Sequence, residues 1–238
     1  MEHECYGPYE RYVKRPLDCF LALVALIVFS PIIGITALIV KIKIGSPVFF
    51  SQERPGLIDP KTGKERIFRL YKFRSMTNEK DTEGNLLPDE KRLTKVGKAI
   101  RAASIDELPE LINIIKGDMS VVGPRPQLVR DMVFFSDDAM CRQSVRGGLT
   151  GLAQTSGRNN LLWEERFDYD LEYVDNYGFF YDLKLIFKTI KKVVKSEDVA
   201  TEGMETSEDY GDYLLRIGAI DKTTYDEKQL EAKELLYK

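Results

Sequence analysis

The sequence predicts an α/β protein that is mostly helical, has few short strands, and is anchored to a membrane by its N-terminal segment. Three observations predict this class. Residues 19–40 form an uncharged apolar run with Ser30-Pro31 in its middle. Residues 101–117 and 179–195 repeat apolar side chains at helical spacing. Strand signals are confined to brief stretches between turn residues. We therefore expect a monotopic domain with a re-entrant broken helix and interfacial amphipathic helices.

Charge is distributed unevenly along the 238 residues, although the formal net charge is only −3. Residues 196–238 contain 12 acidic and 5 basic side chains, which leaves 26 acidic and 30 basic in the rest. A slightly basic body with an acidic tail favours an anionic partner for the body. We divide the chain into an anchor (1–44), a catalytic domain (45–195) and an acidic linker with a helical tail (196–238).

Histidine and cysteine usage excludes many common chemistries. The one histidine is His3, near the N-terminus, so a Ser-His-Asp triad or a histidine-based metal site is not expected. The three cysteines are widely spaced and show no disulfide or zinc pattern, which favours a reducing compartment. An acid, base or nucleophile is therefore expected to be carboxylate, Cys, Lys, Ser or Tyr, and a metal would be oxygen-ligated, such as magnesium.

The apolar run is long enough to span a bilayer, at about 33 Å for a straight helix. Proline in the middle breaks a helical hydrogen bond. Basic residues flank both ends, with Arg11, Lys14 and Arg15 before the run and Lys41 and Lys43 after it. Because basic flanks stay in the cytoplasm, the pattern predicts a helix that enters, bends and returns to the same face. A full span and a buried soluble helix are the alternatives.

The segment after the anchor contains two strand candidates. Residues 48–51 predict a short strand, and Arg54-Pro55-Gly56 predicts a turn after it. Residues 67–76 mix aromatic and basic side chains, as a strand or an interfacial segment would. Single-stranded nucleic-acid binders share that composition, but the apolar anchor and acidic overall charge argue against nucleic acid. A surface loop over 78–90 and a basic helix over 93–103 follow.

The central stretch places Asp106 and Glu107 at the start of an expected helix that ends at Gly117. Either Ser104 and Glu107 form a capping box, or Asp106 is the N-cap with Pro109 in the first turn. The structural interpretation is that the two carboxylates only cap a core helix. The functional interpretation is that they belong to a site that binds an anion.

Downstream features are weaker taken singly. Arg125 lies between Pro124 and Pro126, which present it rigidly, as a phosphate ligand or in an ordinary turn. Residues 142–159 combine arginines and glycines without a standard phosphate-loop fingerprint. Residues 179–195 predict a basic amphipathic helix, suited to an anionic membrane surface or to packing on a soluble core. The tail predicts an acidic linker and two short helices around Gly218, of a kind used in association, so homo-oligomer formation is left open.

Taken together, these motifs resemble the bacterial sugar transferase family, the monotopic phosphoglycosyl transferases, and in particular its small PglC-like members. The resemblance covers residues 12–195. It is carried by the anchor with Ser30-Pro31 and by five further motifs, which are SPVFFSQERPGL (46–57), YKFRSM (71–76), IDELPEL (105–111), GDMSVVGPRP (117–126) and LTGLAQTSGRN (149–159). One departure is Arg146-Gly147-Gly148 where the family often has Arg-Pro-Gly, so we expect a more flexible loop there.

The resemblance implies an enzyme on the cytoplasmic face of the bacterial inner membrane. It would transfer a sugar-1-phosphate from a UDP-sugar to undecaprenyl phosphate, release UMP, and begin a surface glycan, exopolysaccharide or glycoprotein pathway. The family's aspartate nucleophile corresponds to Asp106, and Glu107 would hold Mg²⁺ with it. Substrate-binding positions correspond to Arg101, Arg125, Gln154, Arg158 and Asp182. The sugar itself is not indicated.

The expected chemistry agrees with the residue types, because a carboxylate can attack phosphorus once cations neutralise the charge of the diphosphate. Two other functions are open at this point. One is a lipid phosphatase with an aspartate nucleophile. The other is a non-catalytic membrane-anchored assembly protein in which Asp106 and Glu107 act as helix caps.

Overall fold

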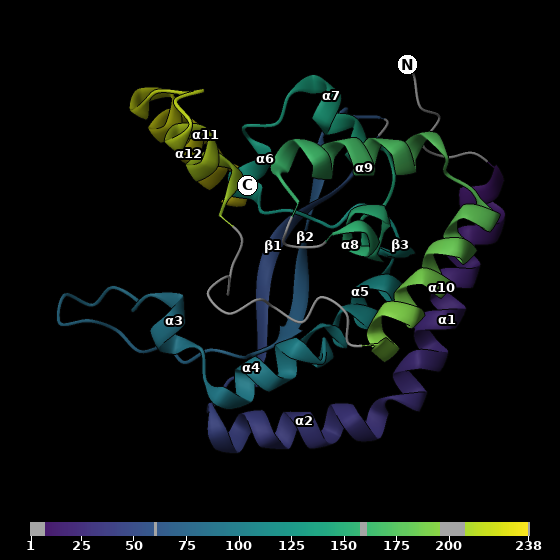
Figure 1. The fold of residues 1–238 in the computed structure, drawn as a ribbon, viewed down its shortest axis with the longest axis horizontal. Helices are drawn as coiled ribbons and strands as arrows, with labels where there is room; N and C mark the ends of the chain where they lie inside the picture. The colour runs from purple at the N-terminus through teal and green to yellow at the C-terminus, as the bar shows by residue number, and fades with distance from the viewer. Residues whose placement is uncertain (1–7, 60, 158–160, 196–207, 238) are drawn as a thin grey trace.

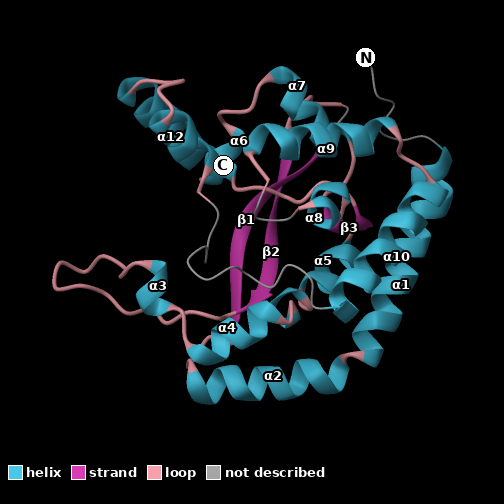
Figure 2. Ribbon diagram, in the orientation of Figure 1, coloured by secondary structure: helices cyan, strands magenta, loops and turns pink. Residues whose placement is uncertain are grey.

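The computed structural model describes residues 8–59, 61–157, 161–195 and 208–237. Helices surround two small sheets in this part of the chain, which confirms a mostly helical α/β protein (Figure 2). One sheet is an antiparallel hairpin of β1 and β2, and the other is a short parallel pair of β3 and β4. The hairpin runs through the middle of the molecule, with α2 and α4 at one end and α9 at the other (Figure 1).

The N-terminal segment expected to be the anchor is a bent pair of helices, preceded by a short π-helical turn. The three elements are η1 (Glu10–Lys14), α1 (Arg15–Val28) and α2 (Ser30–Lys43). No single described helix is long and apolar enough to cross a membrane, but the pair passes that test together and is bent by 63°. The predicted break at Ser30-Pro31 is therefore confirmed.

A hydrogen bond at the break explains why the bend is local. In an unbroken helix the Ile27 carbonyl would accept from the amide of residue 31, but Pro31 has no N–H. The Ser30 hydroxyl donates to that carbonyl instead, at 2.7 Å. The Ser-Pro pair thus removes one helical bond and satisfies the carbonyl that it frees.

The first hairpin strand, β1, spans Phe49–Ile58 and is longer than the expected strand over 48–51. The second strand, β2, spans Glu65–Phe73 and overlaps the candidate over 67–76. The prediction that Arg54-Pro55-Gly56 forms a turn is wrong, since these residues continue β1. Pro55 pairs with Ile67, and the register shifts only between Pro55 and Ile58. Proline fits because each strand of a two-stranded sheet has a free edge, where a missing N–H is tolerated.

The expected basic helix over 93–103 is α4 (Lys95–Ala102), and a single turn, α3 (Asp89–Arg92), precedes it. The expected helix around Asp106 is divided into η2 (Ile105–Glu107) and α5 (Glu110–Lys116). Asp106 and Glu107 lie in the 3₁₀ turn η2, before α5. Ser104 makes no capping bond, and the N-cap of α5 is Pro109. Both predicted caps are therefore wrong, whereas Gly117 ends α5 in the left-handed conformation as expected, with φ of 92°.

The next elements place the Arg125 loop against the parallel strand pair. They are β3 (Ser120–Val122), α6 (Val129–Met132), α7 (Asp137–Met140), η3 (Cys141–Ser144), β4 (Gly148–Thr150) and α8 (Leu152–Ser156). Glycines permit this contact, because a Cβ on Gly148 would lie 2.1 Å from the Gly123 nitrogen. These glycines bring backbone close to backbone, whereas their expected role was an approach to a ligand.

The chain ends in four helices, which are α9 (Trp163–Asp175), α10 (Phe179–Lys195), α11 (Tyr210–Arg216) and α12 (Lys222–Leu236). The predicted helix over 179–195 and the helix pair around Gly218 are confirmed. The last two helices pack on α6 at one side of the molecule (Figure 1). Most of the expected acidic linker lies outside the described residues.

The anchor shares the hydrophobic core of the catalytic domain. Ala22 of α1 lies in one buried cluster with Phe68 and Leu70 of β2 and with Leu111 and Ile114 of α5. Val40 of α2 belongs to another buried cluster with Phe73 and Ile100. Each anchor helix therefore has one face on the domain, which fixes the anchor relative to η2 and α5.

Candidate active site

Asp106 and Glu107 form a dyad of adjacent carboxyl groups, which lies where the chain turns from α4 into η2. Ser104, the residue that makes the turn, has a φ of 54° and is the only described non-glycine residue with positive φ. Left-handed backbone is costly for a side chain such as serine and is found where surrounding structure enforces it. The turn leaves Asp106 largely buried, with 9 % of its area exposed.

Two cations from other elements hold Glu107. The Lys72 ammonium of β2 donates to Glu107 Oε1 at 2.9 Å, and the Arg125 guanidinium donates to the same oxygen at 2.5 Å. Neither the second oxygen of Glu107 nor the carboxylate of Asp106 accepts a hydrogen bond from the described residues. The two adjacent carboxylates thus differ, because Glu107 is held by two ion pairs whereas the Asp106 carboxylate accepts no hydrogen bond from the described residues.

Electrostatics separate the two carboxyl groups further. Burial raises the pKa of Asp106 above its ordinary value, and Glu107 raises it again, against smaller opposing effects of Lys72, Arg125 and Arg101. Burial also raises the pKa of Glu107, but Arg125 and Lys72 outweigh it and hold that pKa well below its usual range. Pairs of carboxyl groups with divergent environments are typical of sites that assign them different tasks.

Lys72 and two further residues that support this arrangement were not predicted from the sequence. Glu110 is buried and forms a second ion pair with Lys72, at 3.1 Å. Burial raises the pKa of Glu110 to about 7 despite Lys72. The fully buried Asn113 accepts from the Tyr71 amide at 3.1 Å and donates to the Arg69 carbonyl at 2.8 Å. These bonds fasten α5 to β2 beside Lys72.

The Arg125 loop is fixed by a buried arginine. Arg142 donates to the Arg125 carbonyl at 2.7 Å and forms a buried ion pair with Asp170 at 2.6 Å. The expectation of a flexible loop at residues 146–148 is not supported. Ser120 donates to the Gly147 carbonyl at 2.8 Å, and Gly148 donates to the Pro124 carbonyl at 3.0 Å. Gly147 also leaves room for Pro126, whose Cγ would lie 2.5 Å from an added Cβ.

The other predicted substrate-binding residues are placed as follows. Arg101 of α4 donates to the Ser75 hydroxyl at 2.9 Å and is close enough to act on the pKa of Asp106. Gln154 of α8 has both amide atoms buried without a hydrogen-bond partner in the described structure. Arg158 lies outside the described residues. The structure therefore brings Arg101 and Arg125 to the dyad and leaves the role of Gln154 a prediction.

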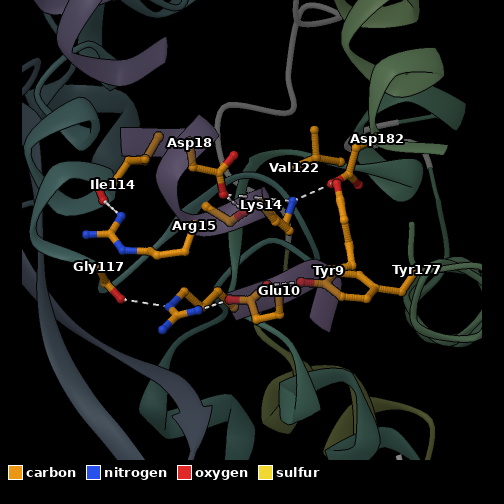
Figure 3. A network of polar contacts seen from close by, with 12 residues as sticks. Tyr9, Glu10, Lys14, Arg15, Asp18, Ile114, Gly117, Val122, Tyr177 and Asp182 are labelled. Atoms are coloured by element: carbon orange, nitrogen blue, oxygen red, sulfur yellow. Dashed lines mark hydrogen bonds and ion pairs between the residues drawn. The ribbon is translucent and has the colours of Figure 1, made fainter. Parts of the chain in front are cut away.

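Asp182 belongs to a different cluster, between α10 and the start of the anchor (Figure 3). Its carboxylate accepts from Lys14 at 2.5 Å, from Tyr9 at 2.6 Å and from Tyr173 at 2.7 Å. Lys14 and Asp182 are both buried. Among the described residues no interaction links Asp182 with Asp106 or Glu107, so the structure does not bring it to the dyad. The cluster joins the amphipathic helix to the anchor.

The same region connects the anchor to the end of α5. Arg15 of α1 donates to the Ile114 carbonyl at 2.6 Å (Figure 3) and to the Ile115 carbonyl at 2.7 Å. Arg146 donates to the Gly117 carbonyl at 2.9 Å and pairs with Glu10. A cation at the C-terminal end of a helix satisfies free carbonyls and favours the helix dipole. The helix α5 that follows the dyad is thereby held by the N-terminal helix α1 and by Arg146.

The two carboxylates of the dyad can supply part of the oxygen ligands of a magnesium ion. The described residues contain no group of three or more His, Cys, Asp or Glu side chains arranged for a metal. Magnesium at phosphate-transfer sites is commonly held by one or two carboxylates together with substrate phosphates. The free carboxylate of Asp106 and the second oxygen of Glu107 supply such a pair.

Comparisons with known proteins identify sequences related to this chain. A family model for bacterial sugar transferases matches residues 9–196. The chain is 50 % identical over 196 residues to the uncharacterized sugar transferase EpsL of Bacillus subtilis, covering 82 % of this chain and 94 % of EpsL. It is 36 % identical over 200 residues to the exopolysaccharide production protein ExoY of Rhizobium meliloti, covering 77 % and 86 %.

A third relative is larger. The UDP-glucose:undecaprenyl-phosphate glucose-1-phosphate transferase of Escherichia coli is 37 % identical over 196 residues, which cover 76 % of this chain and 40 % of the relative. The family match includes the N-terminal helix pair, the dyad and the Arg125 loop, whereas α11 and α12 lie outside it. On these grounds the chain belongs to the bacterial sugar transferase family.

Proposed function

We propose that this protein transfers a sugar-1-phosphate from a UDP-sugar to undecaprenyl phosphate through a covalent intermediate on Asp106. The observation that carries the proposal is the contrast within the dyad, where Glu107 is ion-paired and Asp106 is largely buried with an unengaged carboxylate. Relatives are named as transferases of glucose-1-phosphate and of galactose phosphate to undecaprenyl phosphate, which supports the same reaction class here.

In the first step a carboxylate oxygen of Asp106 attacks the phosphorus bonded to the sugar. The bond from that phosphorus to the bridging oxygen breaks, and UMP leaves with the electron pair. In the second step an oxygen of undecaprenyl phosphate attacks the same phosphorus, which restores the Asp106 carboxylate and yields the lipid diphosphate sugar. Covalent catalysis of this kind replaces one difficult transfer by two easier ones.

The residues around the dyad have complementary tasks in this proposal. Arg125, held rigidly by its loop, stabilises negative charge on the transferring phosphoryl group. Lys72 keeps Glu107 in place, and Glu107 with Asp106 would hold Mg²⁺. When bound, the metal supplies charge neutralisation and orients the diphosphate. The assembly-protein alternative loses its basis, since neither Asp106 nor Glu107 caps a helix.

The exposed apolar side chains support attachment at one face of a membrane. On the anchor, Phe20, Ile27 and Ile35 are each more than 60 % exposed, and on α10 so are Phe180 and Phe187. Lysines 184, 188, 191 and 192 accompany them on α10. Apolar side chains with adjacent cations suit an anionic lipid surface. We place the protein on the cytoplasmic face of the inner membrane, at the first membrane step of a surface glycan pathway.

The test is a burst experiment with purified full-length protein. With a UDP-sugar and Mg²⁺ but no acceptor, UMP should appear in an amount close to one per enzyme, and intact mass should rise by one sugar phosphate. Asp106→Asn should abolish both signals, because an amide cannot attack as an anion. Asp138→Asn, at an exposed position, is the matched control. An adduct on another residue, or normal turnover by Asp106→Asn, would refute the mechanism.

The panel of donors should include UDP-glucose, UDP-galactose and UDP-N-acetylgalactosamine, because relatives are named for each of these sugars. Diacetylated bacillosamine is a fourth donor sugar to include. Sugar retained in the lipid product separates a transferase from a lipid phosphatase.

A further inference from the structure

Arg54 is an arginine in the interior of β1 that has no carboxylate partner. Its Nη1 donates to the Pro126 carbonyl at 3.1 Å, and its Nη2 donates to the Gln52 side-chain oxygen at 2.9 Å. Its Nε is buried and has no hydrogen-bond partner. No carboxylate in the described parts of the chain lies within ion-pair distance of it. A charged group with a buried donor atom is normally paired with an opposite charge, so the unpaired Arg54 guanidinium needs an explanation.

A second cation lies beside it. The Arg54 bond to Pro126 places it next to Arg125, which faces Glu107. Burial and repulsion by Arg125 lower the pKa of Arg54 to about 10, although Asp131, Glu110 and Asp209 act in the opposite direction. Glu107 compensates Arg125, but nothing at contact distance compensates Arg54. A positive charge without a contact partner therefore lies beside Arg125, which itself binds Glu107.

We propose that Arg54 acts with Arg125 to bind a phosphate group of a substrate at the Asp106-Glu107 site. The inference rests on the proposed function and adds a residue to it. A guanidinium is planar, is always charged and presents several donors, so it matches phosphate oxygens. A bound phosphate would give the free Nε a partner and would screen the two arginines from each other. Its source is either the nucleotide or the lipid acceptor.

A purely structural role predicts something different. If Arg54 only connects β1 to the Pro126 carbonyl, its loss would loosen the Arg125 loop and weaken charged and uncharged ligands alike. Arg54→Gln separates the two roles, because glutamine keeps an amide donor but removes the charge. The matched control is Arg69→Gln on β2, where the arginine side chain is 61 % exposed and pairs with Glu53.

The experiment compares binding to full-length protein in lipid nanodiscs. One arm titrates UMP against uridine, and the other titrates a short-chain polyprenyl phosphate against the matching polyprenol. For Arg54→Gln we expect affinity for one phosphate ligand to fall roughly tenfold or more, with less than about twofold change for its uncharged counterpart. The arm that shows the selective loss identifies the source. Arg69→Gln should bind all four ligands like the unmodified protein.

Equal losses for charged and uncharged ligands, or no loss in either arm, would overturn the proposal. If Arg54→Gln does not fold, as judged by thermal unfolding, Arg54→Lys is used in the same comparison. It keeps the charge but not the fork, so a phosphate-selective loss of about threefold or more is expected. Failure of the proposed function would look different, since the unmodified protein would then form no lipid-linked sugar phosphate.

Discussion

At the scale of single residues, the site depends on how Glu107 is held. Two cations that come from separate elements, Lys72 on β2 and Arg125 in the loop after β3, meet on one oxygen of this side chain. The pairing keeps Glu107 ionised and fixed in orientation. It also leaves the carboxylate of Asp106 free to approach phosphorus. Glu107 is therefore a positioning and metal-holding residue in our proposal, and Asp106 is the nucleophile.

Replacing Arg125 by lysine tests whether the shape of the cation matters. Lysine keeps the charge but presents one ammonium, which is a poor substitute for a planar fork on both Glu107 and a phosphate. We expect kcat/KM for UMP release to fall by roughly 10- to 100-fold. The control is Arg69→Lys, which should retain full activity. A variant Arg125→Lys with normal kcat/KM would show that charge alone suffices.

Glu110 predicts how stability depends on pH. Its pKa is about 7 in the folded protein, because burial disfavours the charged form, and it returns to about 4.5 on unfolding. Between these values the folded state binds a proton that the unfolded state lacks, so stability falls as pH rises from about 4.5 to 7. The contribution approaches about 1.4 kcal/mol per pH unit at most.

The matching variant is Glu110→Gln, which cannot ionise. Its thermal unfolding temperature should decrease less between pH 5 and pH 7.5 than that of the unmodified protein, measured in the same detergent. Glu90→Gln, at an exposed position, should keep the original dependence. An unchanged pH dependence in Glu110→Gln would mean that Glu110 ionises normally in the folded state.

Part of the site could be predicted from sequence, because some of its residues are adjacent in short motifs. Asp106, Glu107 and Arg125 belong to two stretches whose composition indicates anion chemistry. The pairing of Lys72 with Glu107 and Glu110 spans some 35 residues and depends on the β2–α5 contact, which no local pattern encodes. Lys72 does stand out as a cation between Tyr71 and Phe73, and that signal was available.

At the scale of elements, the strand and cap errors both come from a local composition that the structure overrides. Arg54-Pro55-Gly56 has the composition of a turn, but pairing with β2 carries these residues through as strand. Asp106 has the composition of a cap, but the left-handed Ser104 and Pro109 shift the helix start beyond it. In β1 a tertiary contact overrides a local preference, whereas at Asp106 the neighbouring backbone turn does so. The anchor break was predictable, because proline removes its hydrogen bond in any context.

The break can be tested by restoring the missing bond. In the double variant Ser30→Leu, Pro31→Leu, residue 31 regains an N–H for the Ile27 carbonyl, so α1 and α2 should join into a straighter helix. Cysteine labelling at positions 11 and 43, with the native cysteines removed, should place both on the cytoplasmic side in the parent protein. In the double variant, position 43 should move to the opposite side in a substantial fraction of molecules.

The control for this labelling is Ser30→Ala, which keeps the proline and should leave both positions on the same side. Labelling of positions 11 and 43 from opposite sides in the parent protein would contradict the re-entrant anchor. The same result would favour a full span through the bent pair.

At the scale of the whole molecule, the tail is joined to the region that supports Arg125. The Asp131 side chain of α6 accepts from the Tyr210 amide of α11 at 2.8 Å, and Arg130 pairs with Asp209 at 3.2 Å. Ala232 of α12 is buried against Val129 and Met132 of α6. The tail thus covers apolar and charged groups of the catalytic domain, although most of it lies beyond the family match.

We expect the tail to be dispensable for chemistry but not for stability. A chain that ends at Lys195 should keep turnover per folded molecule, since no described tail residue contacts Asp106, Glu107 or Arg125. It should unfold more easily, because Val129 and Met132 become exposed and Asp131 loses its donor. Burial of a few apolar side chains is worth about 2 kcal/mol or more.

A matched pair of point variants makes the same test in the full chain. Ala232→Glu at the buried position should lower the unfolding temperature by several degrees, and Lys233→Glu at the exposed neighbour should not. Turnover lost by the truncated protein while it remains folded and membrane-bound would assign the tail a direct part in the reaction.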